Sequence, residues 1–122
     1  MSTENWTPLT KEQVERRFIE MINDYLDLSL QYPLDPDLSI KDVKIANNAE
    51  LQAEFEQMDV DALIAARRNY EVDSIDVLEL VIQIEEEFGC TIDDSDIARL
   101  LRWEDLIGYI TDSQDPTKIK KK

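Results

Sequence analysis

The sequence predicts an all-helical fold. Only two glycines and four prolines interrupt the 122 residues, which favours helices over a β-rich fold. Hydrophobic residues make up 43% of the chain and recur at helical spacing between residues typical of helix ends. A chain of this length forms one domain, so we expect a helical domain over residues 9–112 between two flexible ends, residues 1–8 and 113–122.

The first helix is predicted to begin at a capping pattern. Thr10 and Gln13 have the T-x-x-Q spacing of a capping box. The helix should continue to about Leu30, because Pro33 and Pro36 follow. Its apolar residues recur at helical spacing and are Val14, Phe18, Met21, Ile22, Tyr25 and Leu28.

Residues 31–47 have the composition of a loop, and we expect two short helices after it, within an insertion of about residues 34–69. Asn47 and Glu50 resemble a capping pair for the first short helix. The second runs from Asp59 to Arg68, and its acidic start and basic end suit the helix dipole.

Residues 73–88 form the clearest helix, and Gly89 is expected to end it. One apolar stripe faces the core and consists of Val77, Leu80, Val81, Ile84 and Phe88. A second apolar strip lies well away from it on a helical wheel and is bordered by acids; it consists of Ile75, Leu78 and Ile82, with Glu79 and Glu86 just beyond. Two interpretations remain open: the insertion covers this strip, or the strip is a docking surface with an acidic rim.

Two further helices are expected before the tail. A short one begins at Asp93, Asp94 or Ser95, and a last one contains Trp103, Leu106, Ile107, Tyr109 and Ile110. Cys90 is the only cysteine and the chain has no histidine, so we expect a packing role for Cys90 and no metal site. The lack of a disulfide, of a membrane-length apolar run and of a signal-peptide core predicts a cytoplasmic protein.

The charge of the chain limits its partners. Its net charge is -15, with 28 acids against 13 bases. Phosphate repels such a surface, so nucleic acid and anionic membranes are not expected partners. Proteins with basic patches are favoured, because the charges steer their association.

Ser74 stands at the first turn of the helix over residues 73–88. It is either a plain N-cap or a site of modification. It is a poor catalytic nucleophile, because the chain has no histidine and no nearby lysine to serve as a base. A phosphodiester on Ser74 would lie at the positive end of the helix dipole, so the location suits a serine that carries phosphate.

From residue 73 to residue 110 the sequence resembles the acyl carrier protein family. The residues that carry the resemblance are Asp73-Ser74-Ile75, Glu79-Leu80-Val81, Glu85-Glu86-Glu87-Phe88, Ile92 and Tyr109-Ile110. The resemblance implies a four-helix bundle, here with one or two extra short helices inserted before the attachment site. It also implies a monomeric, non-enzymatic carrier whose Ser74 bears 4'-phosphopantetheine, installed from coenzyme A by a separate phosphopantetheinyl transferase.

The family also implies roles for other residues. Acyl groups would be carried as thioesters on the terminal sulfur of the phosphopantetheine. Asp73 and Asp76 would help the transferase and other partners bind the region around the serine. The partner-recognition face would comprise Ile75, Asp76, Leu78, Glu79, Ile82 and Glu86, and would meet acyl-transferring or acyl-synthesising enzymes with basic docking patches. The candidates for an acyl cavity are Val81, Ile84, Ile92, Ile97, Leu100, Leu106 and Tyr109, for which simple packing is an equally compatible interpretation.

The chain departs from the family pattern in three places. Ile75 stands where the family usually has leucine, Tyr70-Glu71-Val72 replaces a stretch that usually contains glycine, and the insertion lengthens the connection to Asp73. The insertion favours a specialised carrier, in one dedicated lipid, polyketide or secondary-metabolite pathway, over a housekeeping role in fatty acid synthesis. The alternative from another class is an unmodified, acidic protein-interaction module with a carrier-like fold.

Overall fold

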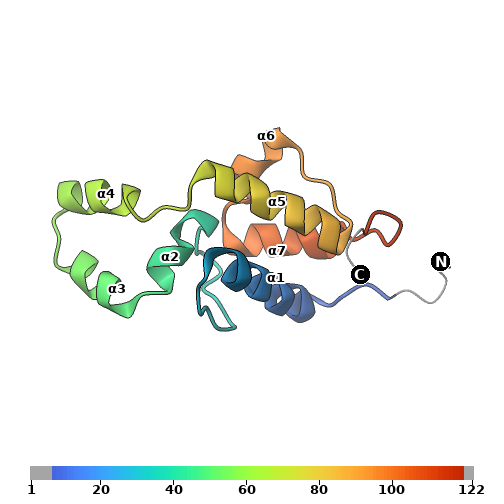
Figure 1. Cartoon of the computed structure of the whole chain (residues 1–122), viewed down its shortest axis with the longest axis horizontal. Helices are drawn as coiled ribbons and strands as arrows, with labels where there is room; N and C mark the ends of the chain where they lie inside the picture. Colours follow the sequence, from blue (N-terminus) through green and yellow to red (C-terminus); the bar gives the residue numbers. More distant parts are fainter. Residues whose placement is uncertain (1–6, 120–122) are drawn as a thin grey trace.

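The computed structural model describes residues 7–119, and this part of the chain contains helices and no strand. Helices α1, α5 and α7 lie together as a bundle beside the short α6, and α3 and α4 form an arm that projects from it (Figure 1). The predicted helical bundle with inserted helices is therefore confirmed. The helices are α1 (Lys11–Leu26), α2 (Val43–Ala46), α3 (Ala49–Glu56), α4 (Val60–Arg68), α5 (Ser74–Phe88), α6 (Asp94–Ile97) and α7 (Trp103–Asp112), with 3-10 turns at Ile40–Asp42 and Ala98–Leu100.

The bundle closes around a core to which α1, α5 and α7 all contribute. The rings of Phe18 and Trp103 stack with centroids 5.3 Å apart, and both side chains are almost fully buried. The predicted core stripe of α5 is buried, apart from Val81, which is half-buried and packs against the core. Burial of these apolar side chains is the main force that holds the bundle together.

The first helix begins as predicted but ends earlier. Thr10 and Gln13 form both hydrogen bonds of the capping box. The predicted end at about Leu30 is wrong, because α1 stops at Leu26 and Asp27 adopts a left-handed conformation with φ 56°. The side chain of Asn23 both accepts from the Leu30 N–H and donates to the Leu30 carbonyl, at 2.8 and 3.0 Å. These bonds replace a further helical turn and fold the chain back toward the bundle.

The loop that follows is fastened to the start of α7. The backbone N–H of Ile40 donates to the Leu101 carbonyl, and that of Trp103 donates to the Leu38 carbonyl, both at 2.7 Å. Two short helical segments, Ile40–Asp42 and α2, lie within the region that the sequence predicted to be loop. The loop is thus held in place by bonds that no local sequence pattern reveals.

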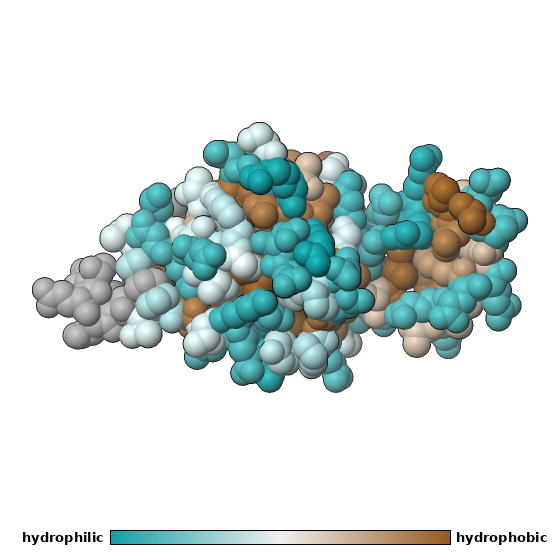
Figure 2. All heavy atoms as spheres, turned by 180° about the vertical axis from the view of Figure 1, so that it is seen from behind, coloured by the Kyte–Doolittle hydropathy of each residue, from teal (hydrophilic) through white to brown (hydrophobic). Residues whose placement is uncertain are grey.

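The inserted arm has a small apolar cluster of its own. Leu51 and Phe55 of α3 are buried outside the main core, and Phe55 meets Tyr70 edge to face at 5.9 Å. The predicted cap of α3 is wrong by one residue: Asn48 accepts from the Leu51 N–H, whereas Asn47 accepts from the Ser29 N–H. Figure 2 shows hydrophobic surface on the arm, where Val60 and Ile64 of α4 are the exposed large apolar residues of that helix.

The end of α5 and the start of the tail lie close together. Gly89 has φ 75°, and a Cβ at this position would overlap the Asp115 carbonyl oxygen. Gln114 bonds to both backbone groups of Leu9, and the Asp115 N–H donates to the Phe88 carbonyl, so the start of the tail contacts the bundle. The predicted flexible residues 1–6 and 120–122 lie outside the described residues. Over residues 7–119 no helix has the length and apolar character needed to cross a bilayer.

Candidate functional site

The hydroxyl of Ser74 lies at the exposed N-terminal end of α5. The possibility that Ser74 is merely the N-cap is wrong, because Asp73 caps the helix and its carboxylate accepts from the Ile75 N–H at 3.1 Å. Ser74 Oγ lies 3.5 Å from the same carboxylate, which is too long for a strong hydrogen bond. Ser74 is therefore an exposed residue in the first helical turn and is not the residue that caps the helix.

Beside Ser74, the second apolar strip of α5 faces solvent. The exposed fractions are 72% for Ile75, 47% for Leu78 and 47% for Ile82. The interpretation in which the insertion covers this strip is therefore wrong, since α3 and α4 project away from the bundle (Figure 1). Glu79 is half-buried and Glu86 is exposed, so an accessible apolar strip carries carboxylates along its side. Such a surface offers apolar area for affinity and charge for orientation.

Asp76 is held by the first helix. The hydroxyl of Tyr25 in α1 donates to Asp76 Oδ1 at 3.0 Å, two residues along the chain from Ser74. This hydrogen bond, together with the nearby charges of Asp76 and Glu79, raises the pKa of Tyr25. Tyr25 is 38% exposed, so it belongs to the surface around the serine. Sequence analysis placed Tyr25 only in the apolar pattern of its helix, and no signal in the sequence pairs it with Asp76.

Six of the seven acyl-cavity candidates line one narrow space in the bundle core. The space has a volume of about 20 Å³, and these six residues are Val81, Ile84, Ile92, Ile97, Leu100 and Leu106. Phe18, Ile40 and Leu101 line it as well, although the sequence did not mark them as cavity residues. Tyr109 does not line the space; its hydroxyl donates to the Thr91 carbonyl. A space of this size holds about one water molecule, so the core is closely packed.

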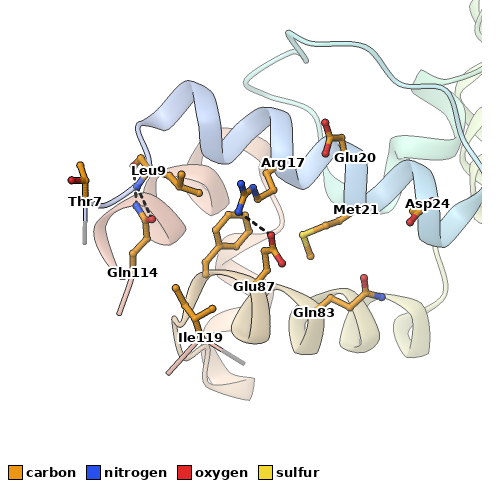
Figure 3. A pocket seen from close by; sticks show the side chains of 11 residues that line it. Thr7, Leu9, Arg17, Glu20, Met21, Asp24, Gln83, Glu87, Gln114 and Ile119 are labelled. Carbon is orange, nitrogen blue, oxygen red and sulfur yellow. Dashed lines mark hydrogen bonds and ion pairs between the residues drawn. The ribbon is translucent and has the colours of Figure 1, made fainter. Parts of the chain in front are cut away.

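Two of the larger surface hollows lie beside α1 and beside the arm. One, of about 480 Å³, lies between α1 and the C-terminal half of α5, and Arg17 and Glu87 form an ion pair of 3.1 Å within it (Figure 3). Because Glu87 lies near the opposite end of α5 from Ser74, this hollow is remote from the serine. The other, of about 550 Å³, lies where the arm meets the loop after α1, and includes Leu34, Phe55 and Leu63.

The side chain of Cys90 is buried. It lies beside α5, and burial raises the pKa of its thiol to about 11. A thiol reacts as a nucleophile only after it loses its proton, so Cys90 is inert near neutral pH. The described residues also contain no group of three or more His, Cys, Asp or Glu side chains that could hold a metal ion.

Comparison with protein families matches residues 40–110 to the family described as "Phosphopantetheine attachment site". The match covers more than half of the chain and includes both Ser74 and the exposed strip of α5. The chain belongs to this family. As a member of the phosphopantetheine attachment family it is a carrier domain and not an enzyme, and its cofactor is phosphopantetheine, as the resemblance over residues 73–110 implied.

Curated relatives of this family member are named "Acyl carrier protein". One from Nitratidesulfovibrio vulgaris is 48% identical over 42 residues, which make up 34% of this chain and 55% of the relative. One from Campylobacter lari is 48% identical over 42 residues, covering 34% and 54%, and one from Campylobacter jejuni is 47% identical over 38 residues, covering 31% and 49%. The chain spans about half the length of the curated relatives it matches. A search of solved structures finds no match.

Proposed function

We propose that the chain is an acyl carrier whose Ser74 bears 4'-phosphopantetheine. The observation that carries the proposal is the exposed hydroxyl of Ser74 on the first turn of α5, beside the exposed apolar strip and within the region matched to the attachment family. The phosphate of the phosphopantetheine group then lies at the positive end of the α5 dipole, near the free N–H groups of the first turn.

The attachment step requires a separate transferase. The Ser74 hydroxyl forms the new P–O bond while the pyrophosphate bond of coenzyme A breaks, and the nucleotide leaves. The serine proton must pass to a base of the transferase, because the chain has no histidine and the Asp73 carboxylate is already engaged by the Ile75 N–H. Asp73 and Asp76 contribute charge next to the serine, where a basic transferase surface binds.

Acyl groups are then carried as thioesters on the terminal sulfur of the phosphopantetheine group. The chemistry of making, extending and transferring them belongs to partner enzymes, which dock on Ile75, Leu78 and Ile82 through basic patches that face Glu79 and Glu86. The inserted arm formed by α3 and α4 supports a role in a dedicated lipid or polyketide pathway rather than in general fatty acid synthesis. The acidic surface supports action in solution, as a monomer in the cytoplasm.

The test is the intact mass of the protein after incubation with coenzyme A, magnesium and a broad-specificity phosphopantetheinyl transferase. We expect the wild type to gain the mass of one phosphopantetheine and Ser74→Ala to gain nothing. Ser95→Ala is the matched control, because Ser95 is an exposed serine that also follows an aspartate in the first turn of a helix. A folded wild type that gains no mass, both in this reaction and when isolated from its own cell, would instead indicate an unmodified interaction module.

A further inference from the structure

We propose that Tyr25 determines the specificity of docking: it extends the recognition face of α5 onto α1 and makes an arginine of the partner enzyme the favoured contact of Asp76. The residues that carry this inference are Tyr25, Asp76 and Glu79, which come from two helices that contact each other (Figure 1). The inference rests on the proposed function, since it concerns the enzymes that dock beside Ser74.

Tyr25 reaches the site because it continues the core stripe of α1 to the end of that helix. Val14, Phe18 and Ile22 follow one another at intervals of four residues and are fully buried. Tyr25 comes three residues later, one residue before α1 ends at Leu26, and is 38% exposed. It therefore lies at the rim of the bundle, where a docking protein can touch it.

The carboxylates beside Tyr25 receive no cation from the described part of the chain. The Tyr25 hydroxyl donates to Asp76 Oδ1 at 3.0 Å, and this hydrogen bond raises the pKa of Tyr25. The negative charge of Glu79 raises that pKa as well, so Glu79 also lies near the phenol. Among residues 7–119 no lysine or arginine forms an ion pair with Asp76 or Glu79. Both carboxylates are half-buried and so less screened by salt than exposed acids, which favours a cation supplied by a partner.

The hydrogen bond also leaves one oxygen of Asp76 for that partner. Oδ1 accepts from Tyr25, whereas Oδ2 has no hydrogen bond with any of residues 7–119. Because the bond holds the carboxylate in one orientation, Oδ2 is presented in a fixed direction and docking has less side-chain motion to restrict. Tyr25 is therefore a positioning residue for Asp76 as well as a contact surface.

An arginine suits this surface better than a lysine. A guanidinium is planar, so it stacks on an aromatic ring while the N–H groups at its edge donate to a carboxylate. An ammonium group is a compact, strongly hydrated point charge that gains less from the ring. The chain contains such a contact elsewhere: the guanidinium of Arg16 lies over the Tyr32 ring, 4.2 Å from its centroid. Tyr25 offers the same kind of ring with a carboxylate beside it.

The test measures how fast a broad-specificity phosphopantetheinyl transferase modifies Ser74, followed by intact mass at several carrier concentrations. We expect Tyr25→Phe, which keeps the ring and loses the hydroxyl, to raise KM by about threefold. Tyr25→Leu loses both and should raise KM by about tenfold. In both variants kcat should stay close to the wild-type value, because docking and not the transfer step is altered. Tyr32→Phe is the control, since the hydroxyl it removes has no hydrogen bond among residues 7–119, and it should keep the wild-type KM.

A double-mutant cycle then identifies the arginine. Each exposed arginine in the basic docking patch of the transferase is replaced in turn by lysine, which keeps the charge. We expect one replacement to raise KM with the wild-type carrier and to have little further effect with Tyr25→Leu. Circular dichroism checks that the carrier variants keep their helix content, and Tyr25→Phe takes the place of Tyr25→Leu in the cycle if the latter does not.

Two failures are distinguishable. A wild type that is modified on Ser74, with a KM that Tyr25→Phe and Tyr25→Leu leave unchanged or with additive effects at every arginine, would overturn this inference and leave the proposed function standing. A folded wild type that takes up no phosphopantetheine would overturn the proposed function and this inference together.

Discussion

The hydroxyl of Tyr25 donates a hydrogen bond of 3.0 Å to Asp76 and so joins α1 to the first turn of α5. The pair lies two residues from Ser74, at the end of α5 where the candidate site is exposed. Because the bond fixes one carboxylate oxygen of Asp76, the charge beside the serine is presented in a defined position. The first helix thus takes part in the surface around Ser74 and does more than pack the core.

This pairing predicts a change in the titration of Tyr25. In Asp76→Ala the pKa of Tyr25 should fall, because the hydrogen bond that stabilises the protonated phenol and the negative charge that disfavours the phenolate are both removed. The titration can be followed by NMR of the labelled tyrosine ring. Asp73→Asn is the control, since Asp73 caps α5 and does not bond to Tyr25. An unchanged Tyr25 pKa in Asp76→Ala would show that the two side chains do not meet in solution.

The acidic side of the exposed strip predicts the effect of reversing its charge. Replacing Glu79 and Glu86 by lysine should weaken transferase binding by about tenfold or more at low salt, since like charges would then face each other across the interface. The control is the double replacement of Glu50 and Glu54 by lysine, which makes the same charge change at exposed positions on α3. Equal weakening by both pairs would mean that only net charge matters and that the strip is not the docking face.

Sequence patterns predicted the elements whose signals are local. The two apolar sets of α5 follow from helical periodicity alone, and the capping box of Thr10 and Gln13 needs only residues three apart. The end of α1 could not be predicted in the same way, because the side chain of Asn23 bonds to Leu30 and competes with further helical turns. Asn47 and Asn48 are both good caps by type, and the bond to Ser29 decides between them.

The candidate site, like the fold, was predictable from the sequence only where its signals are local. The helical wheel allowed two interpretations of Ile75, Leu78 and Ile82, either exposed or covered by the insertion. The structure decides between them, because α3 and α4 project away from these residues. The Tyr25–Asp76 pair joins residues 51 positions apart, and the hollow beside the arm is lined by the loop after α1, by the segment around α2, by α3 and by α4. Such long-range contacts leave no periodic signal, because they depend on how the elements pack rather than on the neighbours of each residue along the chain.

The core stripe of α5 predicts a large loss of stability for one substitution. Phe88 is 1% exposed, so Phe88→Ala should lower the free energy of unfolding by about 3–5 kcal/mol through lost burial and the cavity left behind. Denaturant unfolding followed by circular dichroism measures this loss. Ile82→Ala, on the exposed strip of the same helix, should change stability by no more than about 0.5 kcal/mol. Similar losses in both variants would mean that the faces of α5 are assigned incorrectly.

Burial of Cys90 predicts that the chain itself contributes no reactive thiol. Because the pKa of Cys90 is raised to about 11, its thiolate is scarce at pH 8, and the side chain is also shielded from reagents. Folded protein without the prosthetic arm should therefore not react with a thiol reagent such as dithionitrobenzoate, whereas protein with the arm should react once per chain. Adding denaturant should release one further thiol in each case. Rapid labelling of the folded, unmodified protein would contradict the burial of Cys90.

The separate apolar cluster of the arm predicts that the arm can open without unfolding the bundle. Phe55 packs on Tyr70 and lies outside the main core, so Phe55→Ala removes contacts that hold α3 to the arm and leaves the packing of Phe18 and Trp103 intact. Hydrogen exchange of amides in α3 and α4 should accelerate by more than about tenfold, which corresponds to about 1.4 kcal/mol of local stability. Amides of α1, α5 and α7 should keep their wild-type rates, whereas Phe88→Ala should accelerate exchange in the bundle helices. Uniform acceleration by Phe55→Ala would show instead that arm and bundle unfold as one cooperative unit.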